Sequence, residues 1–76
     1  MNKTRRKKIS DQMEIIMLTR TEIEAIMGDE EEYRDKTPEN LQSSSNWDAS
    51  DVACDHMQEA LDSLEDLLSN LESAIE

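Results

Sequence analysis

The sequence predicts an all-α protein, built as an antiparallel hairpin of two long amphipathic helices. Gly and Pro occur only once each among 76 residues, which disfavours a β fold with many tight turns. Apolar residues recur every three and four positions along two long stretches, as they do on one face of a helix. A short polar stretch separates the two. A chain of this length has room for one small domain, which we assign to residues 1–76.

The first helix is expected at about residues 4–33. Its apolar stripe steps at heptad spacing, with Arg20 in the place of one apolar residue, and consists of Ile9, Met13, Ile16, Ile23 and Met27. Gly28 costs about 1 kcal/mol relative to Ala in a helix interior. The acids at 29–32 then lie near the negative end of the helix dipole. The helix is therefore expected either to fray after Gly28 or to meet positive charge there.

The linker is expected at residues 34–46 and the second helix at about 47–76. Thr37 as N-cap and Pro38 at the first helical position predict a one-turn helix inside the linker. Ser45, followed three residues later by Asp48, approximates a capping box for the second helix. The seam of that helix repeats without a gap through Cys54, Met57, Leu61, Leu64, Leu68, Leu71 and Ile75.

The second seam is wider than a two-helix zipper needs. Four residues stand one position before seam residues and broaden the stripe to three positions per heptad: Ala53, Ala60, Leu67 and Ala74. Two helices alone bury little apolar surface, and so short a chain is marginally stable without further support. We therefore expect a homodimer that forms a four-helix bundle. Trp47 and Tyr33 flank the linker and are expected to pack together.

The acids of the second helix form a track on one face. Residues 37–76 hold ten carboxylates and no Lys or Arg. Seven of the acids step by three and four residues, with Gln58 and Ser69 as the only interruptions: Asp48, Asp51, Asp55, Asp62, Glu65, Glu72 and Glu76. About seven like-charge neighbours at roughly 0.2–0.5 kcal/mol each imply a self-repulsion of roughly 1.5–3.5 kcal/mol. A structural helix could have avoided this repulsion by interspersing Lys.

Two interpretations of the track stay open. One is a solvated face that keeps a small bundle soluble. The other is a surface that docks on a basic protein groove. Its contacts would be Asp48, Asp51, Asp55, Asp62 and Glu65, supported by Glu30, Glu31 and Glu32. One charge per ~5 Å of helix is too dilute to imitate duplex DNA, with one charge per ~1.7 Å. Mimicry of a nucleic acid would therefore need a dimer or the acids at 29–32.

Other chemistry has little support in the sequence. The basic start, with Lys3, Arg5, Arg6, Lys7 and Lys8, is expected to be neutralised by the acidic end of the second helix rather than to bind nucleic acid directly. His56 and Cys54 lack the partners and spacing of a metal site or a catalytic pair, so we expect no metal, cofactor or enzymatic activity. The single cysteine indicates a reducing compartment, and no apolar run is long enough for a signal peptide or membrane span, so a cytoplasmic location is expected.

Two segments of the chain resemble a known family. They are the run GDEEEYRDKTPENLQSS that starts at Gly28 and the final ALDSLEDLLSNLESAIE. The family consists of short acidic helical proteins of unknown function from Gram-positive bacteria and their phages and mobile elements. The resemblance implies no functional residue. By analogy with that setting, it favours an inhibitor of a nucleic-acid-binding or defence protein, acting in the host cytoplasm if phage-encoded. The alternative is an adaptor or antitoxin-like protein that binds a partner helix through its leucine seam.

Overall fold

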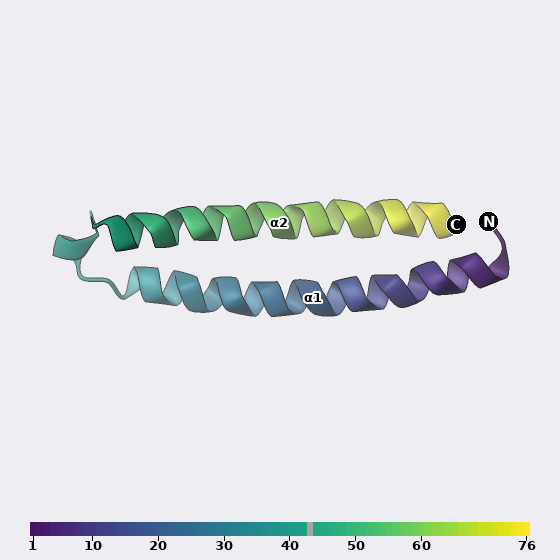
Figure 1. Ribbon diagram of the computed structural model, residues 1–76, viewed down its shortest axis with the longest axis horizontal. Coiled ribbons are helices and arrows are strands. Elements are labelled where there is room, and N and C mark those ends of the chain that lie inside the picture. The colour runs from purple at the N-terminus through teal and green to yellow at the C-terminus, as the bar shows by residue number, and fades with distance from the viewer. Residues whose placement is uncertain (43) are drawn as a thin grey trace.

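Two long helices lie side by side and run in opposite directions (Figure 1). The computed structural model describes residues 1–42 and 44–76. Helix α1 spans Lys3–Asp35, the one-turn 3-10 helix η1 spans Glu39–Leu41, and helix α2 spans Ser45–Ile75. The rod measures 59 × 15 × 13 Å. The helical hairpin predicted from the sequence is confirmed, and each end of the two long helices falls within two residues of its expected position.

Polar side chains cap both long helices at their first turns. The side chain of Asn2 accepts a hydrogen bond from the backbone N–H of Arg5 at 2.8 Å, and Ser44 accepts one from that of Trp47 at 3.2 Å. The cap of α2 is therefore Ser44 and not the predicted Ser45. The prediction of Thr37 as the cap of the one-turn helix is also wrong, because its hydroxyl donates to the carbonyl of Tyr33 at 3.1 Å.

Helix α1 continues through Gly28 without a break and ends at Asp35, so the expected fraying after Gly28 is wrong. Two cations explain the difference. Arg34 lies in the last turn, and the Lys36 ammonium contacts Glu32 Oε1 at 2.6 Å. The backbone N–H of Lys36 also donates to the Glu32 carbonyl at 3.0 Å. Positive charge at a helix C-terminus stabilises it, and here the chain supplies that charge itself.

The core is a single seam between the two helices. Cys54 and Leu61 of α2 are the buried apolar residues within the described chain, at 5% and 6% exposure. The other predicted seam residues are half-buried and line the interface in both helices: Ile9, Met13, Ile16, Ile23, Met27, Met57, Leu64, Leu68, Leu71 and Ile75. Both predicted stripes therefore face each other, but one layer of side chains is all that they enclose.

Two ion pairs across the seam define how the helices are aligned. Arg20 Nη1 lies 3.8 Å from Glu65 Oε1, and Arg34 Nη1 lies 3.0 Å from Asp51 Oδ1. The second pair is 14 residues further along α1 and 14 residues further back along α2, so the alignment is constant. Extrapolated to the other end, it sets Ile9 level with Glu76. Residues 3–8 therefore extend beyond the end of α2, as Figure 1 shows.

Gly28 gives a direct test of the continuous helix. A Cβ atom at this position would meet no atom within 4 Å. We expect Gly28→Ala to raise the free energy of unfolding by about 1 kcal/mol, because Ala has the higher helix propensity and nothing obstructs its methyl group. Urea denaturation followed by circular dichroism measures the change. Ala25→Gly, at an exposed position of the same helix, should lower stability by a similar amount. No gain from Gly28→Ala would mean that α1 is not helical at this point.

Candidate acidic interface

A three-residue pattern sorts the surface of α2 into two faces. It repeats every seven residues, with a seam residue in the middle: Ala53-Cys54-Asp55, Ala60-Leu61-Asp62, Leu67-Leu68-Ser69 and Ala74-Ile75-Glu76. Successive helical residues turn by about 100°. With the middle residue in the seam, the preceding apolar residue points to one side of the hairpin and the following polar residue to the other.

Helix α1 contributes residues to the apolar side. Two antiparallel helices that face each other present the same flank to the same side. Thr19, Ile26 and Tyr33, each one position before a seam residue, therefore join the apolar side. We call this side the apolar face; it comprises Ile26, Tyr33, Ala53, Ala60, Leu67 and Ala74 with Thr19 among them. We call the other side the acid face; it comprises Asp48, Asp51, Asp55, Asp62, Glu65, Glu72 and Glu76.

The acid face consists of two columns with different environments. The inner column borders α1, and two of its members, Asp51 and Glu65, form the ion pairs with Arg34 and Arg20. The outer column is exposed and turned further from α1: Asp48, Asp55, Asp62 and Glu76. Asp62 accepts a hydrogen bond from Gln58 Nε2 at 3.1 Å. Within residues 1–42 and 44–76, none of the outer column forms an ion pair. The outer column is therefore free to meet a partner.

The structure brings together only part of the predicted contact set. Asp48, Asp51, Asp55, Asp62 and Glu65 do share one face. The three predicted supporting acids are divided between environments: Glu30 and Glu31 are half-buried, close enough to influence the thiol of Cys54, and Glu32 is exposed beside Lys36. The structural role of Asp51 and Glu65 was missed in the sequence. The interruption of the apolar stripe by Arg20 is the signal that could have indicated it.

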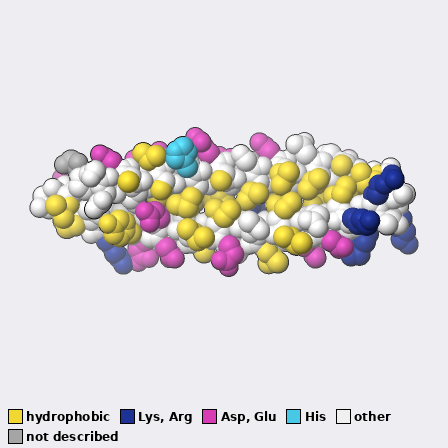
Figure 2. All heavy atoms as spheres, viewed as in Figure 1, with side chains coloured by type: hydrophobic (Ala, Val, Ile, Leu, Met, Phe, Trp, Pro, Cys, Tyr) yellow, Lys and Arg dark blue, Asp and Glu magenta, His cyan; other side chains and the backbone are white. Residues whose placement is uncertain are grey.

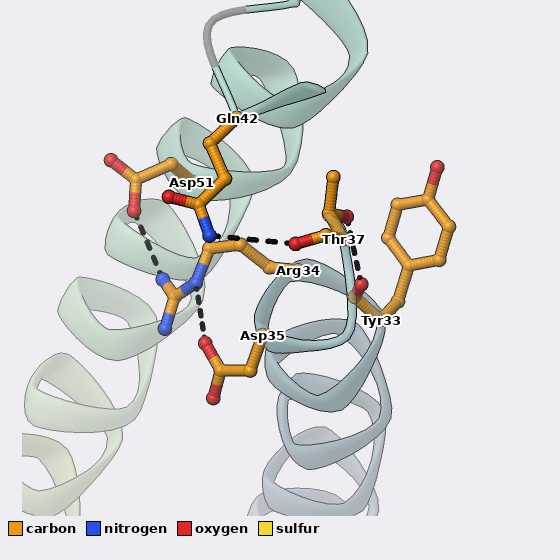
Figure 3. A network of polar contacts seen from close by, with 6 residues as sticks. All are labelled: Tyr33, Arg34, Asp35, Thr37, Gln42 and Asp51. Carbon is orange, nitrogen blue, oxygen red and sulfur yellow. Dashed lines mark hydrogen bonds and ion pairs between the residues drawn. The ribbon is translucent and has the colours of Figure 1, made fainter. Parts of the chain in front are cut away.

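Arg20 occupies a seam position and is incompletely paired. Its guanidinium lies 3.5 Å from Glu24 and 3.8 Å from Glu65, both longer than a good charge-assisted hydrogen bond. Its Nε is inaccessible to solvent, and despite the nearby Glu24 it forms no hydrogen bond of acceptable geometry. Arg34, in contrast, donates to Asp51 at 3.0 Å and to Asp35 at 3.3 Å (Figure 3). Arg34 therefore anchors the linker end of the hairpin more firmly than Arg20 anchors its middle.

Cys54 lies in the seam close to this anchor. Burial raises the pKa of the Cys54 thiol above its ordinary value of 9.0. The positive charge of Arg34 opposes this shift, and the carboxylates of Glu31, Glu30 and Asp51 reinforce it. The thiol is therefore kept protonated and poorly nucleophilic at neutral pH, which suits a packing residue rather than a reactive one.

The basic start does not pair with the acidic end of α2, contrary to the expectation. Lys7 pairs with Asp11 of its own helix, and the Arg6 guanidinium donates to the Met1 carbonyl at 2.9 Å. The reason is the alignment of the helices, which carries residues 3–8 past Glu76. An open groove of about 660 Å³ adjoins this end on the acid-face side, lined by Lys7, Ser10, Asp11, Met13, Glu14, Met17, Leu68, Glu72 and Ile75.

The aromatic residues near the linker have different environments. Tyr33 is 57% exposed, whereas Trp47 is half-buried with an Nε1 that meets no hydrogen-bond partner among residues 1–42 and 44–76. Tyr33 instead borders a shallow hollow together with Lys36, Thr37, Pro38 and Leu41. Tyr33 therefore remains available on the apolar face.

Comparison with known proteins yields no match to any family model, curated protein or solved structure. Among the described residues, no three His, Cys, Asp or Glu side chains come together as metal ligands would. In the same part of the chain, neither long helix is apolar enough to cross a bilayer.

Arg20 is expected to favour the observed alignment of the two helices while lowering the stability of the hairpin. Arg20→Met should raise the free energy of unfolding by about 1 kcal/mol, because a hydrophobic side chain replaces a poorly paired charge and Glu65 stays exposed to water. Urea denaturation provides the measurement. Arg34→Met is the matched control and should destabilise the hairpin, since its hydrogen bond to Asp51 is short. A loss of stability in Arg20→Met would show that Arg20 contributes more than alignment.

The raised pKa of Cys54 predicts a pH dependence of stability. Above the ordinary thiol pKa of 9.0 the unfolded chain loses this proton before the folded chain does, so the free energy of unfolding should fall as pH rises. The contribution is complete below that pH and is lost progressively up to the folded pKa. Denaturation between about pH 8 and about pH 11 tests this. Cys54→Ala should give a flatter profile, and identical slopes for both proteins would contradict the burial of the thiol.

Proposed function

We propose that this protein is a non-enzymatic interaction protein that docks its acid face on a basic protein surface. The observation that carries the proposal is the outer column, which stays exposed and forms no ion pair with any described residue, although Arg side chains of α1 neutralise acids of the neighbouring column. The ion pairs with Arg34 and Arg20 give Asp51 and Glu65 of the inner column a role in folding. Folding does not account in this way for Asp55 and Asp62, which add to the repulsion in a chain of net charge −11. Asp48 also lies in the first turn of α2, where a carboxylate favours the helix dipole.

The spacing of the outer column describes the partner. Asp48, Asp55 and Asp62 are seven residues apart, which is about 10 Å along a helix. Duplex DNA carries one charge per ~1.7 Å, and a single strand one per ~3.4 Å. The fitting partner is a basic protein groove with well-separated cations. A groove that normally holds nucleic acid is the specific version, which would make the protein a phage or mobile-element inhibitor of a nucleic-acid-binding or defence protein.

We further propose that the protein is a homodimer. Cys54 and Leu61 are the buried apolar residues of the described chain, and several large hydrophobic side chains remain exposed in the hairpin: Met1, Ile15, Met17, Leu18, Ile26, Tyr33, Leu41, Val52 and Leu67. Exposed apolar area of this kind commonly marks an interaction surface. A second copy that covers part of it would form the four-helix bundle that the wide seam of α2 favours.

A second candidate function is an adaptor or antitoxin-like protein that binds a partner helix. The exposed apolar face favours it, because Leu67 borders the leucine seam and is 41% exposed. In this case a partner would be held mainly by apolar contacts. Binding would then be lost on Leu64→Asp or Leu68→Asp and would change little when the acids are neutralised.

The docking proposal predicts salt-sensitive binding that depends on the outer column. Asp48→Asn, Asp55→Asn and Asp62→Asn together should reduce capture of a basic partner from host lysate at least tenfold, because partner cations lose their counter-charges. Capture by the unchanged protein should weaken steeply with salt.

The control for this experiment carries the same change in charge on other surfaces. Glu22→Gln, Asp29→Asn and Glu39→Gln together also remove three charges, all from exposed positions outside the acid face. This control should bind as the unchanged protein does. Equal loss in both triple variants would indicate a general charge effect. Binding that is insensitive to salt would exclude electrostatic docking.

A further inference from the structure

The apolar face is a candidate interface because hydrophobic side chains form a band along most of it. Figure 2 looks onto this face and shows the band, with Asp and Glu along its edges. Tyr33, Ile26 and Leu67 are exposed by 57%, 56% and 41%. The alignment of the helices places Ile26 within one residue of the level of Ala60, and Thr19 within one residue of the level of Leu67. Each of these two levels therefore pairs a large side chain of one helix with a smaller one of the other.

Charge is distributed unevenly between the two ends of the rod. Residues 23–63, the half that contains the linker, hold two Lys or Arg and twelve Asp or Glu, a net charge of −10. Residues 1–22 and 64–76 hold six Lys or Arg and seven Asp or Glu, a net charge of −1. Figure 2 shows most of the cations gathered at the end where the chain begins. Lys3, Arg5 and Lys8 extend past α2 and meet no acid of that helix within the described residues.

We propose that a second copy of the chain docks on the apolar face end for end, with the basic start of each copy over the acidic linker end of the other. This inference rests on the proposed homodimer and specifies its face and orientation. The opposite choice, with both linkers at one end, would stack a charge of −10 on another −10. The end-for-end choice brings each −10 half against the half that carries the overhanging cations.

Side-chain sizes fit the same orientation. The midpoint of the aligned region lies near residues 22–23 of α1 and 63–64 of α2. A two-fold axis there sets Leu67 of one copy over Ala60 of the other, and Ile26 over Thr19. Both of these contacts join a large residue to a smaller one, as close packing at a bundle interface requires. The same axis sets Ala53 of one copy over Ala74 of the other, where two small side chains meet.

The arrangement has a consequence for the acid face. The apolar and acid faces lie on opposite sides of each hairpin, so joining the apolar faces turns the two acid faces outward in opposite directions. The dimer then holds two separate acid faces, which engage two basic partners. It does not merge them into one surface with the charge density of a duplex.

Disulfide trapping tests the orientation. In a Cys54→Ala background, Ala60→Cys and Leu67→Cys chains are prepared separately, mixed and treated with a mild oxidant, with a mass tag on one chain. The mixture should form a covalent heterodimer readily, because the two sulfurs lie within bridging distance. Each variant alone should form little disulfide-linked homodimer, since the two cysteines of such a dimer are about 10 Å apart. Preferential trapping of Ala60→Cys with Ile26→Cys would overturn the orientation.

Sedimentation equilibrium tests the face without cysteine chemistry. Leu67→Glu should convert the dimer to monomer, whereas Leu18→Glu, which changes a 69% exposed side chain away from both faces, should leave it dimeric. Circular dichroism confirms that each variant remains helical. An unchanged protein that is monomeric, or a Leu67→Glu variant that stays dimeric, would overturn the inference. Leu67→Glu keeps the acid face intact, so partner capture by this variant reports on the proposed docking separately.

Discussion

The structure depends on one seam of side chains between two helices. A hairpin cannot enclose a second layer, so each helix has one face to bury and leaves two flanks beside it. Cys54 and Leu61, at 5% and 6% exposure, are the buried apolar residues in the described part of the chain. A core this thin leaves little margin, because small domains already bury a low fraction of their surface. The side chains on these flanks therefore determine whether the chain self-associates and what kind of partner it can bind.

Charged residues inside the seam determine how the helices are aligned. Apolar side chains at heptad spacing would pack nearly as well after a slip of seven residues, whereas only the observed alignment gives both Arg20 and Arg34 a carboxylate. After such a slip Arg34 would meet Gln58 or Ser44. A polar residue at such a position commonly defines register at some loss of stability. The same alignment carries residues 3–8 beyond Glu76 and leaves Asp48, Asp55 and Asp62 unpaired. Both proposed interfaces are consequences of it.

Periodicity was sufficient to predict the elements and the seam, because burial on one helix face imposes a 3.6-residue pattern that is visible in the chain. Caps were harder. Ser44 and Ser45 are chemically equivalent candidates, and the choice between them depends on where the preceding turn ends. The pairing state of each acid could not be predicted at all. It depends on the register of α2 against α1, and a linker of this length is compatible with several registers. The expected neutralisation of the basic start was wrong for this reason.

The distribution of cations bears on the two interpretations of the acid face. A face that served only for solubility could carry Lys among its acids, which would relieve the repulsion within α2. Instead, all eight Lys and Arg lie between Lys3 and Lys36, and Arg20 and Arg34 neutralise acids only where the two helices meet. Placing Lys on the outer column would stabilise α2 without disturbing the seam, and no such residue is present. The hairpin thus lowers repulsion where the two helices meet and retains exposed negative charge at Asp48, Asp55 and Asp62, which the proposed docking on a basic partner would use.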